Sequence, residues 1–150
     1  MSNHDGFTMI ELIVVIIILA IMSTTVIPKF FNSTGFQEYT YQAEVITKLR
    51  SIQLRAMQQT NSGECHTVLV MENALGIPEN CNLTSGNWHS DTTSVIIQDN
   101  HDVIFDVPPG NYFFTFDGMG RPSCSTCLIT ILADSTLTIK IESEGYIHEG

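Results

Sequence analysis

The four cysteines are the residues of this 150-residue sequence with the greatest capacity for covalent chemistry. Cys124 and Cys127 form a Cys-x-x-Cys motif, while Cys65 and Cys81 stand further apart. An even number of cysteines in a short chain with an apolar N-terminus is typical of an oxidising compartment, where cysteines pair. We predict one structural disulfide between Cys124 and Cys127 in a turn and a second between Cys65 and Cys81. Crossed pairing between the two couples is the alternative.

Redox or metal chemistry at these cysteines is disfavoured. A redox motif places its first cysteine after a strand and at the start of a helix, whereas Arg121-Pro122-Ser123 precedes Cys124 and a strand-like run follows Cys127. A zinc site built from the four cysteines would need a second close pair, which the sequence lacks. We expect neither a metal site nor a cofactor.

Two histidines stand beside carboxylates, in His89-Ser90-Asp91 and in His101-Asp102. This arrangement suits a metal ligand or a general base with its orienting acid. Both pairs lie in polar, turn-like sequence with no nucleophile motif nearby, so we interpret them as surface histidines. The sequence therefore predicts no catalytic residue and a protein that is not an enzyme.

Trp88 is the only tryptophan and lies in the polar segment 84–90. An exposed aromatic ring in such a loop can stack on a sugar or on another protein. The alternative is a ring that folds back onto the core. Trp88 is the one candidate ligand-binding residue that the sequence offers.

The charge balance limits the classes of partner. Six basic residues against 16 acidic residues give a formal net charge of −10, which repels phosphate backbones, so nucleic acid is not an expected partner. Hydrophobic residues make up 43% of the chain and charged residues only 15%, well below the usual quarter. This composition indicates a dry segment that belongs in a membrane or an assembly.

The dry segment lies at the N-terminus. Residues 7–27 include a single charged residue, Glu11, and as a helix they would measure about 31 Å, the thickness of a bilayer core. No small-residue cleavage site follows the apolar run, so we expect it to stay with the mature protein. A lone carboxylate costs on the order of 3 kcal/mol at the bilayer centre. Glu11 therefore needs a cationic partner, unless it lies shallow and reaches headgroup water.

The segment Gly6-Phe7-Thr8-Met9-Ile10-Glu11-Leu12 resembles the processing site of type IV prepilins. The resemblance implies that a prepilin peptidase cuts between Gly6 and Phe7 and N-methylates Phe7. It also implies that Glu11 attracts the new α-amine of Phe7 on a neighbouring subunit during assembly. Opposite charges in a medium of low dielectric favour both ionised forms, so this pairing would supply the missing cation. The leader Met1–Gly6 departs from the pattern because it has no Lys or Arg.

The sequence beyond the anchor predicts a second, amphipathic half of the helix. Pro28 lacks an N–H and restricts the residue before it, so we expect the helix to kink or loosen near Ile27. The resemblance to pilins implies that the helix melts locally near Pro28 inside the assembled filament, which gives Pro28 an assembly role. The apolar stripe of the second half is expected to pack on a head, and Leu54, off the stripe, to touch other subunits. The stripe consists of Val45, Ile46, Leu49, Ile52 and Ala56.

After Asn61-Ser62-Gly63, which ends the helix, short β-prone runs alternate with turn residues. The predicted strands are 65–71, 94–98, 103–107, 112–116, 128–133, 137–142 and 146–148. The expected fold class is α+β: a long N-terminal α-helix, half transmembrane and half amphipathic, packed on an antiparallel β-rich C-terminal head, as in pilins. The expected division is a leader (1–6), a transmembrane assembly helix (7–28), an amphipathic helix (29–60) and a globular head (61–150).

The C-terminal third carries a second resemblance. Phe116-Asp117-Gly118-Met119-Gly120-Arg121-Pro122 and the terminal Ser143-Glu144-Gly145-Tyr146-Ile147 are similar to the end of the H-type minor pseudopilins and their minor-pilin relatives, including those of mannose-sensitive haemagglutinin pili. The resemblance implies a low-abundance structural subunit of a type IV pilus, at its tip or in its initiation. A type II secretion pseudopilin and a pilus-displayed adhesin are the alternatives.

The same resemblance implies partners and a location. The partners would be other pilin subunits, the prepilin peptidase and the inner-membrane assembly platform, with a surface receptor or sugar as a further candidate. The protein would cross the bacterial inner membrane once, with its head in the periplasm, before it joins a pilus or pseudopilus.

Overall fold

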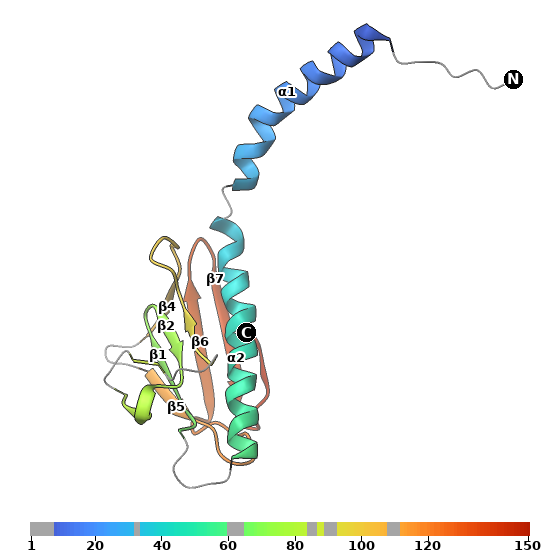
Figure 1. Ribbon diagram of the computed structural model, residues 1–150. Helices are drawn as coiled ribbons and strands as arrows, with labels where there is room; N and C mark the ends of the chain where they lie inside the picture. Colours follow the sequence, from blue (N-terminus) through green and yellow to red (C-terminus); the bar gives the residue numbers. More distant parts are fainter. Residues whose placement is uncertain (1–7, 32–33, 60–64, 84–86, 89–92, 108–111) are drawn as a thin grey trace, which may run out of the picture. The chain divides into compact units, whose positions relative to one another are not determined.

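The computed structural model describes residues 8–31, 34–59, 65–83, 87–88, 93–107 and 112–150. The chain divides into two compact units, Met1–Ser33 and Thr34–Gly150. The first unit consists of helix α1 (Met9–Phe31). The second, called the head below, contains helix α2 (Thr34–Gln58) and all the strands that the described residues form (Figure 1).

Helix α1 begins with a side-chain cap. The Oγ1 atom of Thr8 accepts a hydrogen bond of 3.3 Å from the backbone N–H of Glu11, and the Thr8 carbonyl accepts one of 3.2 Å from Leu12. The first bond satisfies one of the N–H groups that a helix start leaves unpaired, and the second is the first ordinary backbone bond of the helix. Within the described part of the chain, no helix is both long enough and apolar enough to cross a membrane.

Of the two outcomes expected near Ile27, loosening is not found, because the backbone stays helical across Pro28, and a kink stays a prediction. Helix α1 continues through Pro28 and ends at Phe31, and α2 begins at Thr34. A proline inside a helix removes one backbone hydrogen bond and costs about 3 kcal/mol, but it does not have to end the helix. In α1 the residues on both sides of Pro28 keep helical geometry.

Helix α2 packs on the head through the predicted stripe, which is confirmed. Val45, Leu49 and Ile52 are fully buried, and Ile46 and Ala56 are nearly so. Residues three and four apart in a helix lie on one face, so this stripe forms a continuous apolar surface. The helix contacts strands of both sheets described next (Figure 1).

Both sheets are antiparallel. The first has the strand order β3-β2-β1-β5 and the second the order β4-β6-β7-β8. Strands of the first sheet are β1 (Thr67–Met71), β2 (Ala74–Gly76), β3 (Val95–Ile96) and β5 (Tyr112–Thr115). Strands of the second sheet are β4 (Ile104–Asp106), β6 (Thr126–Leu132), β7 (Thr136–Glu142) and β8 (Ile147–Glu149). A short 3-10 turn, Glu79–Cys81, follows β2.

The seven predicted strands are all found, with ends shifted by one or two residues, and the α+β class is confirmed. Strand β2 is the one that the sequence reasoning missed. It pairs with β1 through Met71↔Ala74, so the hairpin turns on Glu72 and Asn73. This turn contains neither glycine nor proline, the strongest turn signals in a sequence.

A single hydrophobic core joins α2 to both sheets. Its members lie between Tyr41 and Ile147, so the head contains the complete core within its own residues. Phe105 and Phe114 are its largest fully buried side chains, one from each sheet. The Phe105 N–H also donates a 2.8 Å hydrogen bond to the Glu72 carbonyl, which ties β4 to the β1–β2 turn.

Candidate functional site

The N-terminal site is centred on Glu11 in the first turn of α1. Its side chain is exposed, and it is the only acidic or basic residue between Thr8 and Pro28. A side chain in the first turn lies near the positive end of the helix dipole. Gly6 and Phe7 lie outside the described residues.

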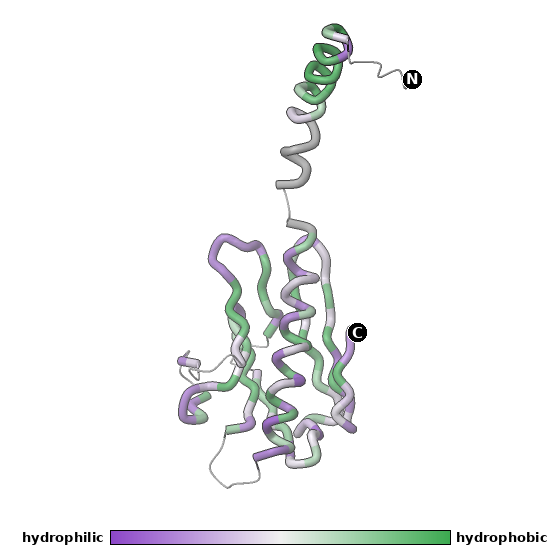
Figure 2. Tube along the Cα trace, turned by 45° about the vertical axis from the view of Figure 1, so that its right-hand side comes forward, coloured by the Kyte–Doolittle hydropathy of each residue, from purple (hydrophilic) through white to green (hydrophobic). Residues whose placement is uncertain are grey.

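The side chains of α1 make no core of their own. From Met9 to Met22 the large apolar side chains are between 44% and 80% exposed, on every side of the helix. Figure 2 shows this stretch as a continuous hydrophobic band. The hydroxyl groups of Ser23 and Thr24 donate to the carbonyls of Leu19 and Ile21, so neither needs an outside partner. A helix with this surface is built to be covered by something apolar.

Helix α2 presents a second apolar face besides its core stripe. Phe36, Tyr39, Leu54 and Met57 are 76%, 53%, 54% and 46% exposed. Their spacing places them at the two ends of one side of the helix, with exposed Ala43, Thr47 and Arg50 between the two pairs on that side. The neighbouring side is polar, with Glu44, Lys48 and Arg55. The head therefore has, at both ends of one side of α2, apolar side chains that its own core does not use.

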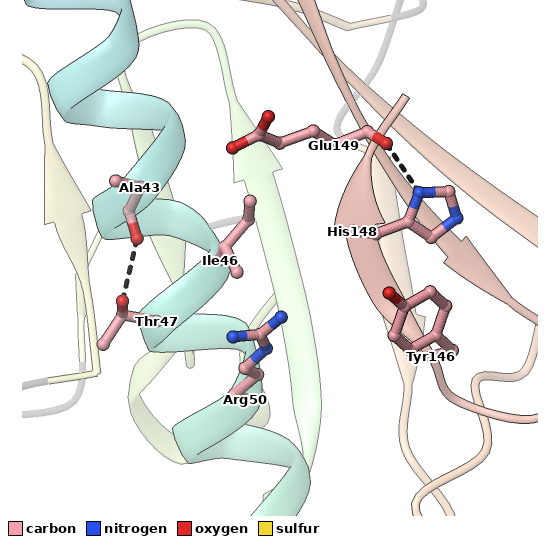
Figure 3. Close-up of a pocket in the computed structure, with 7 residues that line it drawn as sticks. All are labelled: Ala43, Ile46, Thr47, Arg50, Tyr146, His148 and Glu149. Atoms are coloured by element: carbon pink, nitrogen blue, oxygen red, sulfur yellow. Dashed lines mark hydrogen bonds between the residues drawn. The ribbon is translucent and has the colours of Figure 1, made fainter.

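A groove runs beside this surface, between α2 and β8 (Figure 3). It consists of two adjoining hollows of about 610 and 380 Å³ that share Arg50 and Tyr146. The Tyr146 side chain is 65% exposed, and its ring stacks on His148 with centroids 4.9 Å apart. Figure 3 shows Arg50 and Glu149 reaching into the groove from opposite walls.

Arg50 also caps the edge of the second sheet at β8. Its Nη2 atom donates a 2.9 Å hydrogen bond to the carbonyl of Ile147 in β8, which is the outer strand. An unpaired strand edge invites further strands, and a side-chain cap of this kind reduces that tendency. The groove is therefore lined by side chains of mixed charge rather than by a free strand edge.

The cysteines form two bridges in the head. The structure joins Cys65 to Cys81 and Cys124 to Cys127, and no cysteine is free. The second bridge connects the turn before β6 with the buried Cys127 inside that strand. Asn80 and Cys81 have positive φ angles of 53° and 55°, a conformation that residues other than glycine rarely adopt.

The comparisons with known proteins agree with this geometry. A family model described as the prokaryotic N-terminal methylation motif matches residues 1–27. Among solved structures, the crystal structure of the type IV minor pilin FimU from Pseudomonas aeruginosa has a TM-score of 0.51 and 14% sequence identity, over 75% of this chain and 87% of that chain. A second crystal form of FimU has a TM-score of 0.49 and 15% sequence identity, over 75% of this chain and 91% of that chain. No curated protein sequence matched the chain.

The chain combines a prokaryotic N-terminal methylation motif at residues 1–27 with a pilin-like fold. At 14% identity the likeness to FimU establishes the fold, an N-terminal helix with an antiparallel β-rich head. The motif match covers residues 1–27, which include Gly6, Phe7 and Glu11.

The remaining candidate residues have structural surroundings in this pilin-like head. Trp88 is half-buried and forms an isolated β-bridge with Pro78. The Nδ1 atom of His101 lies 2.7 Å from the Tyr41 hydroxyl, so it links a loop to α2. His89 and Asp91 lie outside the described residues. Among the described side chains, no group of three or more His, Cys, Asp or Glu residues could hold a metal ion.

The sequence reasoning missed the groove and the second face of α2 as a whole. Leu54 was singled out, but Tyr146 and Arg50 come from elements nearly 100 residues apart, and nothing local in the sequence indicates that they meet. The spacing of Phe36, Tyr39, Leu54 and Met57 was a signal that could have been read.

Proposed function

We propose that the chain is a low-abundance subunit of a type IV pilus, held in the bacterial inner membrane by its N-terminal helix before assembly. A prepilin peptidase removes residues 1–6 after Gly6 and methylates Phe7. The inner-membrane assembly platform then adds the subunit to a filament of other pilins. The helix itself, from Phe7 past Pro28, is the assembling element.

The observation that supports this proposal most strongly is the lone acid in an exposed apolar helix. Glu11 is the single charged residue among the exposed apolar side chains of α1 between Met9 and Met22. Packing such helices together removes apolar surface from water or lipid, and it leaves Glu11 as the one group that requires an opposite charge. The α-amine of Phe7 on the adjoining subunit is a suitable cation, because processing creates it at the start of the same helix.

The second apolar face of α2 supports assembly through the head as well. Exposed apolar patches on a soluble surface are commonly contact sites, and Leu54 and Met57 extend this face to the end of α2. The groove beside it, with Tyr146 on its rim, is a concave surface into which part of a neighbouring subunit can fit.

The low-abundance role, in initiation or at the tip, rests on two resemblances. The segments Phe116–Pro122 and Ser143–Ile147 are similar to H-type minor pseudopilins, and the solved structure that resembles the head is named as a minor pilin. The same features suit a pseudopilin of a type II secretion system. Deleting the gene and measuring piliation and secretion separately distinguishes the two.

The proposal is tested on sheared filaments. We expect mass spectrometry to find a mature chain that begins at Phe7 and carries one added N-terminal methyl group. We also expect the protein to be a trace component of the filaments, with fewer filaments formed after its deletion. Material that still begins at Met1, or filaments that lack the protein and form normally without it, would remove the proposal.

A further inference from the structure

The charged residues of the head are unevenly distributed. Residues 56–120 contain eight acidic residues and no Lys or Arg, and residues 122–139 contain one acidic residue and again no Lys or Arg. All the basic residues of the head therefore lie on α2, directly after Gly120, or in β7. They are Lys48, Arg50, Arg55, Arg121 and Lys140. The two ends of α2 consequently have different electrostatic surroundings.

An exposed apolar patch lies at the end of α2. The Nε2 atom of Gln53 donates to the carbonyls of Gly120 and Gly145, at 2.7 Å each, which brings their two turns against the helix. The Met57 sulfur also lies beside Gly120, since a Cβ on that glycine would come within 2.9 Å of it. The large apolar side chains at this place are between 46% and 69% exposed, and we call them the Tyr146 patch. They are Leu54, Met57, Met119 and Tyr146.

The Tyr146 patch is hollowed and is surrounded by more basic than acidic residues. Arg50, Leu54 and Tyr146 are among the residues that line the smaller hollow of the groove, about 380 Å³ in volume. Thioether side chains are flexible and polarizable, so Met57 and Met119 can adapt to a partner. Three arginines belong to this end of α2 and its two adjoining turns, against two acidic residues. The arginines are Arg50, Arg55 and Arg121, and the acidic residues are Asp117 and Glu144.

The other end of the head lies beside the start of α2. The Tyr41 hydroxyl accepts a 3.2 Å hydrogen bond from the Gln98 N–H and lies 2.7 Å from Nδ1 of His101, so the loop after β3 packs there. The Ser135 hydroxyl donates to buried Glu38, so the turn between β6 and β7 packs there too. Tyr41 lies 12 residues, or about 18 Å of helix, before the glutamine that holds the turns of the Tyr146 patch. Figure 1 shows the loop after β3, in yellow, and those turns at opposite ends of the head.

This other end is acidic and also exposes apolar side chains. The Asn73 carbonyl of the β1–β2 turn accepts a 2.9 Å hydrogen bond from the Ile97 N–H, and the preceding carbonyl binds β4 as described above. Next to these contacts, Ile96 and Ile104 are 59% and 40% exposed. Five exposed acidic residues accompany them, and the segments 72–73, 96–106 and 133–135 contain no Lys or Arg. We call this set the Ile104 patch, and its acidic residues are Glu72, Asp99, Asp102, Asp106 and Asp134.

We propose that the Tyr146 patch of one copy of this chain binds the Ile104 patch of a second copy, head to tail. The two patches are complementary in charge, and both offer apolar side chains for the centre of a contact. They lie at opposite ends of one head, so each copy keeps one patch free for the next copy. The inference rests on the proposed function for its place in a filament, and it names the neighbour of the head as a further copy of the same subunit. A subunit of low abundance forms this contact where a few copies follow one another.

The test is sedimentation velocity of the purified head, residues 34–150, which contains the whole hydrophobic core and both disulfides. Small interfaces are weak, so the head is measured at concentrations up to about 1 mM. Arg50→Glu reverses a charge of the Tyr146 patch, and Asp106→Lys reverses one of the Ile104 patch. Leu54→Ser removes apolar surface without touching the bond from Arg50 to β8. Lys140→Glu is the control, because it makes the same change in net charge as Arg50→Glu but lies in β7, outside both patches.

We expect wild-type heads to form species larger than a dimer as the concentration rises, since a head-to-tail contact leaves a free patch at each end. Arg50→Glu, Asp106→Lys and Leu54→Ser should each weaken association at least about tenfold, whereas Lys140→Glu should change it less than about threefold. An equal mixture of Arg50→Glu and Asp106→Lys heads should associate again. The intact Ile104 patch of the first variant then binds the intact Tyr146 patch of the second. Thermal melts establish that each variant is folded.

Wild-type heads that remain monomeric, or a mixture that associates no better than its components, overturn the inference. Association that stops at a dimer and is lost in Arg50→Glu alone overturns it as well, because the Tyr146 patch then pairs with itself across a two-fold axis. Processing after Gly6 and incorporation into filaments are measured separately, so they leave the proposed function standing in each of these cases. A chain that is absent from filaments, with heads that associate as expected, removes the proposed function and keeps the contact between copies.

Discussion

The side-chain amide of Gln53 donates a 2.7 Å hydrogen bond to the backbone carbonyl of Gly120. The same Nε2 atom donates a second bond of 2.7 Å to the carbonyl of Gly145. Gly120 ends the turn that begins at Asp117, and Gly145 lies in the turn between β7 and β8. One glutamine of α2 thus holds two turns that are distant in sequence against the helix.

Replacing Gln53 with leucine should destabilise the head. The change leaves two carbonyl groups without their donor, and losing a partly buried hydrogen bond costs on the order of 1–2 kcal/mol. Urea denaturation of the head alone, residues 34–150, measures the free energy of unfolding. Gln58→Leu is the control, since Gln58 is exposed at the end of the same helix. Equal stabilities for the two variants would show that Gln53 does not hold the turns.

Gly145→Ala should be more damaging than Gly118→Ala. Gly145 has a φ of +91°, which side chains rarely adopt, and a Cβ there would collide with the Gly120 carbonyl and the Gln53 amide. Gly118 has open space at its Cβ position. We expect a loss of more than about 1 kcal/mol for Gly145→Ala and a change within about 0.5 kcal/mol for Gly118→Ala. A thermal melt of each head resolves the difference, and a reversed order would contradict the conformational argument.

The contacts of α2 with these turns could not be predicted from the sequence, whereas its contacts with the core could. The core stripe of Val45, Leu49 and Ile52 was predictable because helical periodicity is a local signal. Strand β2 was missed because it has only three residues and its turn contains no glycine or proline. The Gln53 bonds join residues 67 and 92 positions apart, so they arise from the folded backbone alone.

At the N-terminal site the central residue was predictable from the sequence, whereas the course of the helix was not. Glu11 was identified because one acid in an apolar run is a conspicuous local feature. The continuation of α1 through Pro28 was not predictable. The free-energy cost of one lost hydrogen bond competes with the stability of the helical residues on both sides, and the sequence does not show which is larger. Pairing of Glu11 with the amine of a neighbour involves a second molecule, so it remains a prediction.

The Cys65–Cys81 bridge should contribute more stability than the Cys124–Cys127 bridge. In the chain-entropy model the constraint on the unfolded chain grows with loop length, and the first bridge closes a separation of 16 residues against three. We expect the double variant Cys65→Ala/Cys81→Ala to lose about 3 kcal/mol and Cys124→Ala/Cys127→Ala to lose less. Urea denaturation of both variants measures the difference. The expectation fails if the short loop proves to be the more stabilising.

Asp117 should make the head less stable in acid. The backbone N–H of Arg121 donates to its carboxylate, and with the Met119 N–H and the Arg121 side chain it lowers the pKa of Asp117. A lowered folded-state pKa means that the stabilisation is present above the unfolded pKa of about 3.9 and is lost as the pH falls through the folded value. Wild type should therefore exceed Asp117→Asn in stability near neutrality, and the two should converge in acid.

Denaturant titrations across that pH range provide the measurement. Asp134→Asn is the control, because Asp134 is an exposed turn acid for which the structure shows no such set of donors. A gap between wild type and Asp117→Asn that stays constant with pH would mean that the carboxylate charge does not carry the effect.

Glu11→Ala should abolish incorporation into filaments while leaving the head folded. Glu11 lies in α1, and the core members all lie between Tyr41 and Ile147, so the free energy of unfolding of the head should not change. Without the carboxylate, the α-amine of the neighbouring Phe7 has no counter-charge in an apolar contact, and burying an unpaired charge costs several kcal/mol. That penalty corresponds to at least about a hundredfold loss of incorporation.

Immunodetection of the protein in sheared filaments and in membranes measures the loss. Glu44→Ala is the matched control, since it removes an exposed acid from α2 with the same change in net charge. Glu11→Asp tests the role of charge alone, because it keeps the carboxylate on a shorter side chain and should restore part of the incorporation. Normal incorporation of Glu11→Ala, with the variant present in membranes at wild-type levels, would place the assembling charge elsewhere.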